Sequence, residues 1–247
     1  MHYYIRENIM LRKELEDILI ADLVLTIAFA LVMVGGIGNI APLIGTFIYF
    51  LPISFVAVSL SFVLHELMHK FTAEKFGAIA GFRTSMYGLA ITLLTSFFGF
   101  LIGIPGATMI YTHNFTKRED GIVSIAGPLT NFAIFIIFLS IGLFAFPNFL
   151  ENVTLSLSSS YYTLPYLQNL INMVLFISIL LAFFNMLPIY PLDGSKVLRW
   201  NKPIFFAMIL IIFALFALVV PIYSIIVGML FMLLIAYIFS LFYRGLF

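Results

Sequence analysis

Two histidines and a glutamate form the pattern His-Glu-Leu-Met-His, with His65 and His69 four residues apart and Glu66 beside the first. On a helix, both imidazoles project from one face, so that both can reach a single Zn²⁺ ion. The Glu66 carboxylate is then placed to take a proton from a water molecule that the metal activates. The pattern predicts a hydrolytic site with one Zn²⁺ per chain.

The residues before this pattern are apolar. The stretch 47–64 carries no charged residue, as expected of a membrane-spanning helix. A different interpretation is a helix end whose two histidines extend to the lipid headgroups. Ionisable groups joined to a spanning helix are costly and are usually functional, which favours the metal site.

Composition places the whole chain in a lipid bilayer. Hydrophobic residues make up 63% of the 247 positions and charged residues only 9%, too few to solvate a protein surface. We expect an all-α, multi-pass integral protein of the cell membrane. A net charge of +1 indicates that no nucleic acid is bound. Because the chain has no cysteine, a metal must be held by histidine, carboxylate, carbonyl or water.

Apolar runs predict about six transmembrane helices in one domain, 1–247, with a core at 42–199. The predicted spans are 18–36, 42–69, 122–146, 167–186, 203–220 and 222–242. We interpret the first as an uncleaved helix, although the small residues at 35–38 also resemble a signal-peptide cleavage site. Asp22 lies about one turn inside that helix, so we expect it to reach the membrane interface; pairing with a neighbour or lining a water path are the alternatives.

The uncharged run 85–112 could be a seventh span or could return to the side that it left. A return places all twelve Lys and Arg in one compartment, which the positive-inside rule identifies as the cytosol. The N-terminus and the zinc site then face the cytosol. Gly99, Gly103, Pro105 and Gly106 favour a re-entrant or short β element between the second and third helices. A helical hairpin would satisfy the same parity.

Asp193 is the candidate third ligand, because catalytic zinc usually has three protein ligands and one open position. Two prolines precede it and Gly194 follows it, so a broken helix could direct the carboxylate into a cavity. Spacing alone favours equally a second role, in which Asp193 caps the next helix at the surface.

Taken together, the pattern at 65–69 and the later motif Asn-x-x-Pro-x-x-Pro-Leu-Asp-Gly resemble the site-2 protease family of intramembrane zinc metalloproteases. The resemblance implies that His65, His69 and Asp193 bind zinc and that Glu66 is catalytic. It also implies a transmembrane protein substrate, cleaved within or near its membrane segment. No inserted PDZ domain and no appended CBS domain is expected.

Two asparagines match further elements of this family. Gly127 to Asn131 resembles its Gly-x-x-x-Asn element, and Asn185 opens the second zinc motif. Either side chain could hydrogen-bond the substrate backbone or the developing oxyanion, or could instead satisfy a helix end.

The resemblance further implies strand addition by the substrate at an edge within 85–120, and a lateral gate formed by the last helices, 203–243. The chain departs from the family at 104–107, which reads Ile-Pro-Gly-Ala in place of a Pro-Gly-Gly type element. Two other functions are a transporter, which would not need both zinc motifs, and a non-proteolytic zinc-binding scaffold, which would typically have lost Glu66 or a ligand. We assign no catalytic role to His2 or His113.

Overall fold

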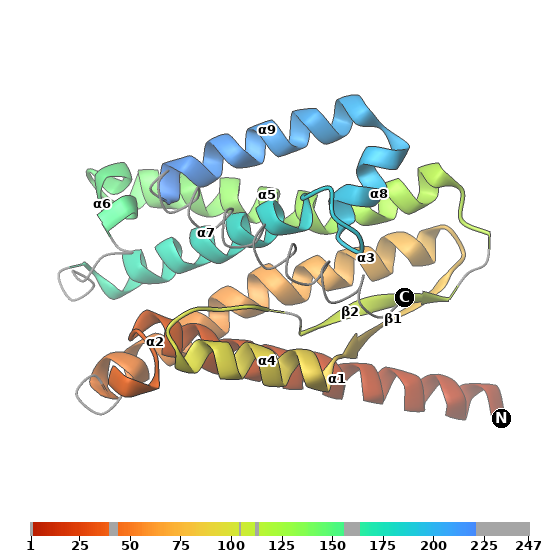
Figure 1. The fold of residues 1–247 in the computed structure, drawn as a ribbon, viewed down its shortest axis with the longest axis horizontal. Coiled ribbons are helices and arrows are strands. Elements are labelled where there is room, and N and C mark those ends of the chain that lie inside the picture. Colours follow the sequence, from red (N-terminus) through yellow and green to blue (C-terminus); the bar gives the residue numbers. More distant parts are fainter. Residues whose placement is uncertain (1, 40–43, 104, 112–113, 156–163, 221–247) are drawn as a thin grey trace, which may run out of the picture.

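The computed structural model describes residues 2–39, 44–103, 105–111, 114–155 and 164–220, and these are mostly helical (Figure 1). Its longer helices run roughly along the long axis of the molecule. The elements in chain order are α1 (His2–Met33), η1 (Ile37–Asn39), α2 (Ile44–Val58), η2 (Ser59–Val63), α3 (Leu64–Lys75), β1 (Ile79–Thr84), α4 (Met86–Phe97), β2 (Gly106–Tyr111), α5 (Lys117–Ala145), α6 (Phe149–Leu155), α7 (Tyr166–Asn185), α8 (Asp193–Trp200) and α9 (Lys202–Val219).

Four helical stretches are long and apolar enough to cross a membrane, which supports a multi-pass membrane protein. They are the continuous helix Ile44–Lys75, formed by α2, η2 and α3, and the helices α5, α7 and α9. These four correspond to the second to fifth predicted spans. The first predicted span, 18–36, begins in α1 but extends three residues past its end, and α1 is not among the four. The sixth, 222–242, lies outside the described residues. Six spans therefore remain a prediction.

Helix α7 lies between the two apolar cores of the protein. Ile171, Leu175 and Ile179, which recur at helical spacing, pack into a core shared with α5, α6 and α9. On the other side, Val174 and Ile177 join a core with α1, α2 and α4. A helix that is apolar on all sides becomes buried, so α7 is the central support of the bundle.

The run 85–112 contains α4 and then β2, which pairs with the strand β1 that directly precedes the run. β1 and β2 pair in antiparallel register, from Ile79 opposite Tyr111 to Thr84 opposite Gly106. The run therefore returns to the place where it began, as predicted, and a short β element is present. Helix α4 between the strands was not expected. Its 12 residues are too few to cross a bilayer, which takes about 20.

Two acidic side chains of α1 hold this sheet. Glu14 is buried, accepts a hydrogen bond from Phe82 N (3.1 Å) and forms an ion pair with Lys70 (2.6 Å). Asp17 accepts from Thr84 Oγ1 (2.8 Å). Because Lys70 belongs to α3, Glu14 joins the sheet to the helix that carries both histidines.

Helix α1 also contacts the turn just before those histidines. There the helix widens into the π-helical turn η2, whose first residue, Ser59, donates from Oγ to Asp22 Oδ2 (2.7 Å). Asp22 is only 4% exposed, so the expectation that it reaches the interface is wrong. Its partner lies on a distant helix, and pairing with it makes burial of the carboxylate possible.

Candidate metal centre

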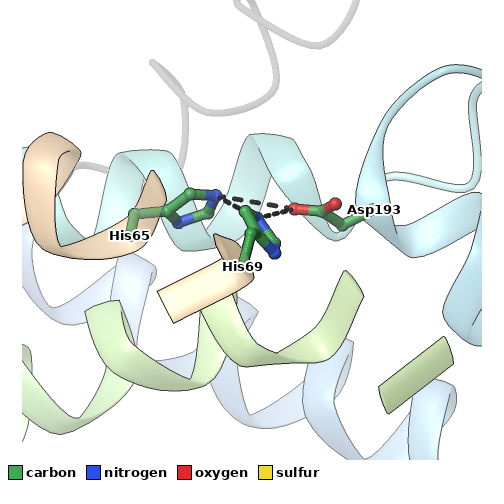
Figure 2. A group of neighbouring side chains, drawn as sticks. All are labelled: His65, His69 and Asp193. Carbon is green, nitrogen blue, oxygen red and sulfur yellow. Dashed lines mark hydrogen bonds and ion pairs between the residues drawn. The ribbon is translucent and has the colours of Figure 1, made fainter. Parts of the chain in front are cut away.

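Three side chains from two distant segments converge at one place (Figure 2). His65 and His69 project from α3, and Asp193 stands at the start of α8. His69 Nε2 lies 3.0 Å from His65 Nε2 and 3.1 Å from Asp193 Oδ2, and the third spacing, from His65 Nε2 to Asp193 Oδ2, is 3.5 Å. The two motifs that are remote in sequence thus meet at one point.

These spacings fit a zinc ion. Zinc bonds of about 2.0–2.1 Å to nitrogen and oxygen, arranged tetrahedrally, place neighbouring ligand atoms about 3.3 Å apart. The observed separations of 3.0 to 3.5 Å bracket that value. Two imidazoles and one carboxylate are also the donor set of a catalytic zinc site, which keeps a fourth position open.

Both imidazoles are oriented by α5. His69 Nδ1 lies 2.8 Å from the carbonyl oxygen of Val123, so it carries the proton and donates, leaving Nε2 free to bind a metal. His65 Nδ1 lies 3.1 Å from the fully buried side-chain amide of Asn131. The amide atom nearest to His65 is Nδ2, and the buried Oδ1 has no hydrogen-bond partner among the described residues. Metal binding through His65 Nε2 would require a proton on Nδ1, and turning the amide over would present Oδ1 as its acceptor. Asn131 therefore holds a ligand in place.

Gly127 explains why this part of α5 can approach the histidines. A Cβ atom added there would overlap the Nε2 atoms of both His65 and His69. Only glycine leaves that space to the ligand atoms and to a metal between them. Steric crowding therefore explains why the Gly-x-x-x-Asn element has glycine at its first position. Its asparagine, Asn131, lies one turn further along the same helix.

Close packing of the chain after α7 brings Asp193 to the histidines. A Cβ atom on Gly194 would collide with the backbone of Met186 and Leu187, so glycine lets α8 begin directly against the end of α7. Burial opposes the charge of the Asp193 carboxylate, but His69 and His65 keep its pKa below the usual range. The carboxylate is therefore ionised, as a metal ligand must be.

Glu66 lies beside the cluster and is held by strand β2. Its Oε2 accepts from Thr108 N (2.9 Å) and lies 2.9 Å from Thr108 Oγ1, which is also 3.0 Å from the Glu66 carbonyl oxygen. Its carboxylate is thus anchored to the sheet edge. Thr108 was not predicted from the sequence, because 42 residues separate the pair and only the strand register reveals the contact.

Asn185 is the predicted site residue that forms no contact with His65, His69 or Asp193 among the hydrogen bonds of the described residues. Its Nδ2 donates to the Leu181 carbonyl oxygen (3.0 Å) one turn earlier in α7, the helix-end role that the sequence left open. No hydrogen bond joins it to the three ligands in the described part of the chain. His113 and the side chain of His2 lie outside the described residues.

Comparisons with known proteins agree with this chemistry. The family model described as Peptidase family M50 matches residues 53–204, more than half of the chain, including both zinc motifs. A putative zinc metalloprotease of Methanocaldococcus jannaschii is 39% identical over 150 residues, which are 60% of this chain and 70% of the relative.

A second protein of that organism, described as a zinc metalloprotease, is 29% identical over 150 residues, 61% of this chain and 34% of the relative. The chain thus spans about a third of that relative's length. No solved structure matches. The resemblance predicted from the motifs is confirmed.

Proposed function

Because the chain belongs to peptidase family M50 and is a zinc metalloprotease, we propose that it hydrolyses peptide bonds within or near the transmembrane segments of membrane proteins. The observation that carries this proposal is the convergence of His65, His69 and Asp193 at the end of an apolar helix 32 residues long. Ligands on such a helix put the reaction close to the lipid, where the substrate lies.

His65, His69 and Asp193 would hold one Zn²⁺ per chain. A zinc ion held there would supply Lewis acidity, which polarises a carbonyl and makes water more acidic. Glu66 accepts the proton of the attacking water at its carboxylate and returns it to the leaving amine nitrogen. Asn131 and Val123 keep the two imidazoles in the orientation that presents Nε2.

Strand β2 offers the substrate its docking edge. Phe82 and Thr108 face each other in the sheet, and both of their N–H groups point outward. Glu14 accepts a hydrogen bond from the N–H group of Phe82, which blocks the β1 edge to an added strand. On the β2 edge the outward N–H of Thr108 is likewise bonded, to Glu66, so a substrate strand that pairs there must first displace this carboxylate. A substrate segment that unfolds from its helix and adds to β2 would lie beside the catalytic carboxylate.

We further propose that the N-terminus and the zinc site face the cytosol, with the chain in the cell membrane. This orientation rests on the positive-inside rule and on the return of the run 85–112 to its starting point. The last helices, 203–243, would gate access from the lipid. Of these, α9 is described and residues 221–243 are not.

The test uses the full chain and a library of single-span transmembrane peptides, with products identified by mass spectrometry. The zinc-loaded protein should cleave members of the library inside or beside the apolar segment. Glu66→Gln should abolish cleavage while zinc content stays unchanged, because Glu66 moves protons and is not a ligand. Retained cleavage in this variant, or no cleavage by the unaltered protein, contradicts the proposal. Zinc binding without any cleavage would indicate the scaffold function.

A further inference from the structure

A cavity of about 650 Å³ adjoins the proposed docking edge. Thr108, Met109 and Ile110 of β2 form one wall. The first turn of α5, the helix α8 and the loop before it close the cavity. Its remaining lining residues are Phe115, Thr116, Lys117, Asp120, Tyr190, Lys196 and Arg199. The cavity thus connects the strand that holds Glu66 with the helix that supplies Asp193.

The charges of this cavity are unbalanced. Lys117 and Asp120 lie three residues apart and share a face of α5, as Lys196 and Arg199 do on α8. Arg199 pairs with Asp120 across the gap (3.1 Å). Among the described residues, neither Lys117 nor Lys196 has an ion-pair partner. Two lysines therefore line the cavity without an ion-pair partner among the described residues, beside a single carboxylate, Asp120, that Arg199 already pairs.

The strand register places this cavity close to the scissile bond. A segment on the β2 edge advances about 3.3 Å per residue, so the distance from Thr108, beside Glu66, to Ile110 is about 7 Å. A substrate side chain about two or three residues from the cleaved bond would therefore enter the cavity. Tyr190 is 80% exposed at the cavity and offers an apolar ring to the stem of such a side chain.

We propose that this cavity is a substrate subsite for an acidic side chain, with Lys117 and Lys196 as the residues that recognise the carboxylate. The proposal rests on the proposed proteolytic function and narrows its substrate class. It favours substrates with an aspartate or glutamate close to the cleavage site on the cytosolic flank. Such a requirement would exclude many transmembrane helices as substrates, because their cytosolic flanks are enriched in Lys and Arg.

The test measures kcat/KM in uncharged detergent for one cleaved transmembrane peptide, in which Asp, Asn or Lys is placed in turn at each position around the cleaved bond. At one position Asp should exceed Lys by roughly three- to tenfold, the range for partly exposed charge pairs, and the preference should weaken at high salt. Lys196→Glu should reverse the preference, and Lys117→Gln with Lys196→Gln should abolish it. Lys75→Gln, at the far end of α3, should leave it unchanged.

Zinc content and elution volume identify any variant that fails to fold. Equal cleavage of the Asp, Asn and Lys peptides overturns the subsite, although cleavage itself still supports the proteolytic function. An anionic lipid headgroup is the rival occupant. If a headgroup occupies the cavity, Lys196→Glu should slow the cleavage of all peptides equally, and only in vesicles that contain phosphatidylglycerol. That result also overturns the proposal.

Discussion

The sheet on one side of the metal centre and helix α9 on the other are attached to the protein by different interactions. β1 is held by the buried carboxylate of Glu14 and the partly buried carboxylate of Asp17, through contacts of 2.8 to 3.3 Å. Helix α9, after Lys202, is apolar throughout. It packs on α7 through stacked rings such as Phe216 on Phe183, whose centroids are 4.9 Å apart.

The difference indicates which side can move. Hydrogen bonds and ion pairs to buried carboxylates depend on direction and distance, so a small displacement of the sheet would leave charged groups unpaired. Apolar contacts have no such directionality and allow one helix to slide on another. Under the proposed function, the sheet side would align a substrate strand with Glu66, and α9 would admit it.

The largest expected effect comes from a substitution at the candidate metal centre, which lies between the sheet and α9. Gly127→Ala should eliminate zinc binding and, with it, proteolysis, because the added methyl group would occupy the space of both ligand nitrogens. Zinc is measured by mass spectrometry on purified protein. Gly142→Ala is the matched control. Gly142 lies on the same helix as Gly127 but far from the histidines, and its added methyl group would crowd Phe149 of α6. This variant should keep its zinc. Full zinc occupancy in Gly127→Ala would disprove the steric argument.

Tethering α9 should produce the next largest effect. With Phe183→Cys and Phe216→Cys, a short bis-methanethiosulfonate crosslinker would join α7 to α9 in a chain that has no other cysteine. Cleavage of a transmembrane peptide should fall by about tenfold or more, as expected when a gating motion is blocked, while zinc stays bound. Dithiothreitol should restore the rate. Unchanged activity of the crosslinked protein would exclude α9 from gating.

On the sheet side, the expected change is in stability. Glu14→Ala leaves Lys70 and the Phe82 N–H without their buried partner and should lower the free energy of unfolding by about 3 kcal/mol. Denaturant unfolding in detergent micelles measures this. The exposed pair Arg12–Glu16 provides the comparison, and Glu16→Ala should cost less than about 0.5 kcal/mol. Similar losses in both variants would mean that burial of Glu14 adds nothing.

Thr108→Val should have the smallest effect and tests alignment alone. The variant keeps the backbone N–H bond to Glu66 but loses the hydroxyl, so kcat should fall about tenfold, equivalent to about 1.4 kcal/mol, with KM and zinc content unchanged. Thr108→Ser should retain most of the rate. Thr84→Val removes a comparable hydroxyl–carboxylate bond elsewhere in the sheet. If it lowers kcat equally, the Thr108 effect is only structural.

The same contrast explains what the sequence could predict. The spacing of His65 and His69 follows the helical period, so both were predicted from the sequence itself. For Asp193 the motif left a capping role equally open, and the family resemblance made it the predicted third ligand. The structure brings the three side chains together. The family resemblance identified Asn131, but its contact with His65 depends on how α5 packs against α3. Local patterns determine which side chains a helix presents, and packing determines what they touch.

The run 85–112 marks where sequence reasoning ends. Its glycines and prolines predicted a return, and the return is present. The helix α4 inside it is stabilised by Ser85 Oγ, which accepts a hydrogen bond from Gly88 N (3.1 Å), and by packing against α1. The apolar composition of the run revealed neither interaction. The contact of Thr108 with Glu66 depends on a one-residue choice of register, since a shift by one would turn every side chain of β2 to the other face.

The carboxylates at both edges of the sheet also bear on aggregation. If the substrates are transmembrane helices, as proposed, the protein works among extended apolar chains, and an unpaired strand edge is a template for such chains to add indiscriminately. At the rung where Phe82 faces Thr108, Glu14 covers one edge and Glu66 the other. An incoming strand must displace Glu66 from Thr108 before it can pair there. Under the proposed function, the carboxylate that takes part in cleavage would also protect the resting enzyme from pairing with passing chains.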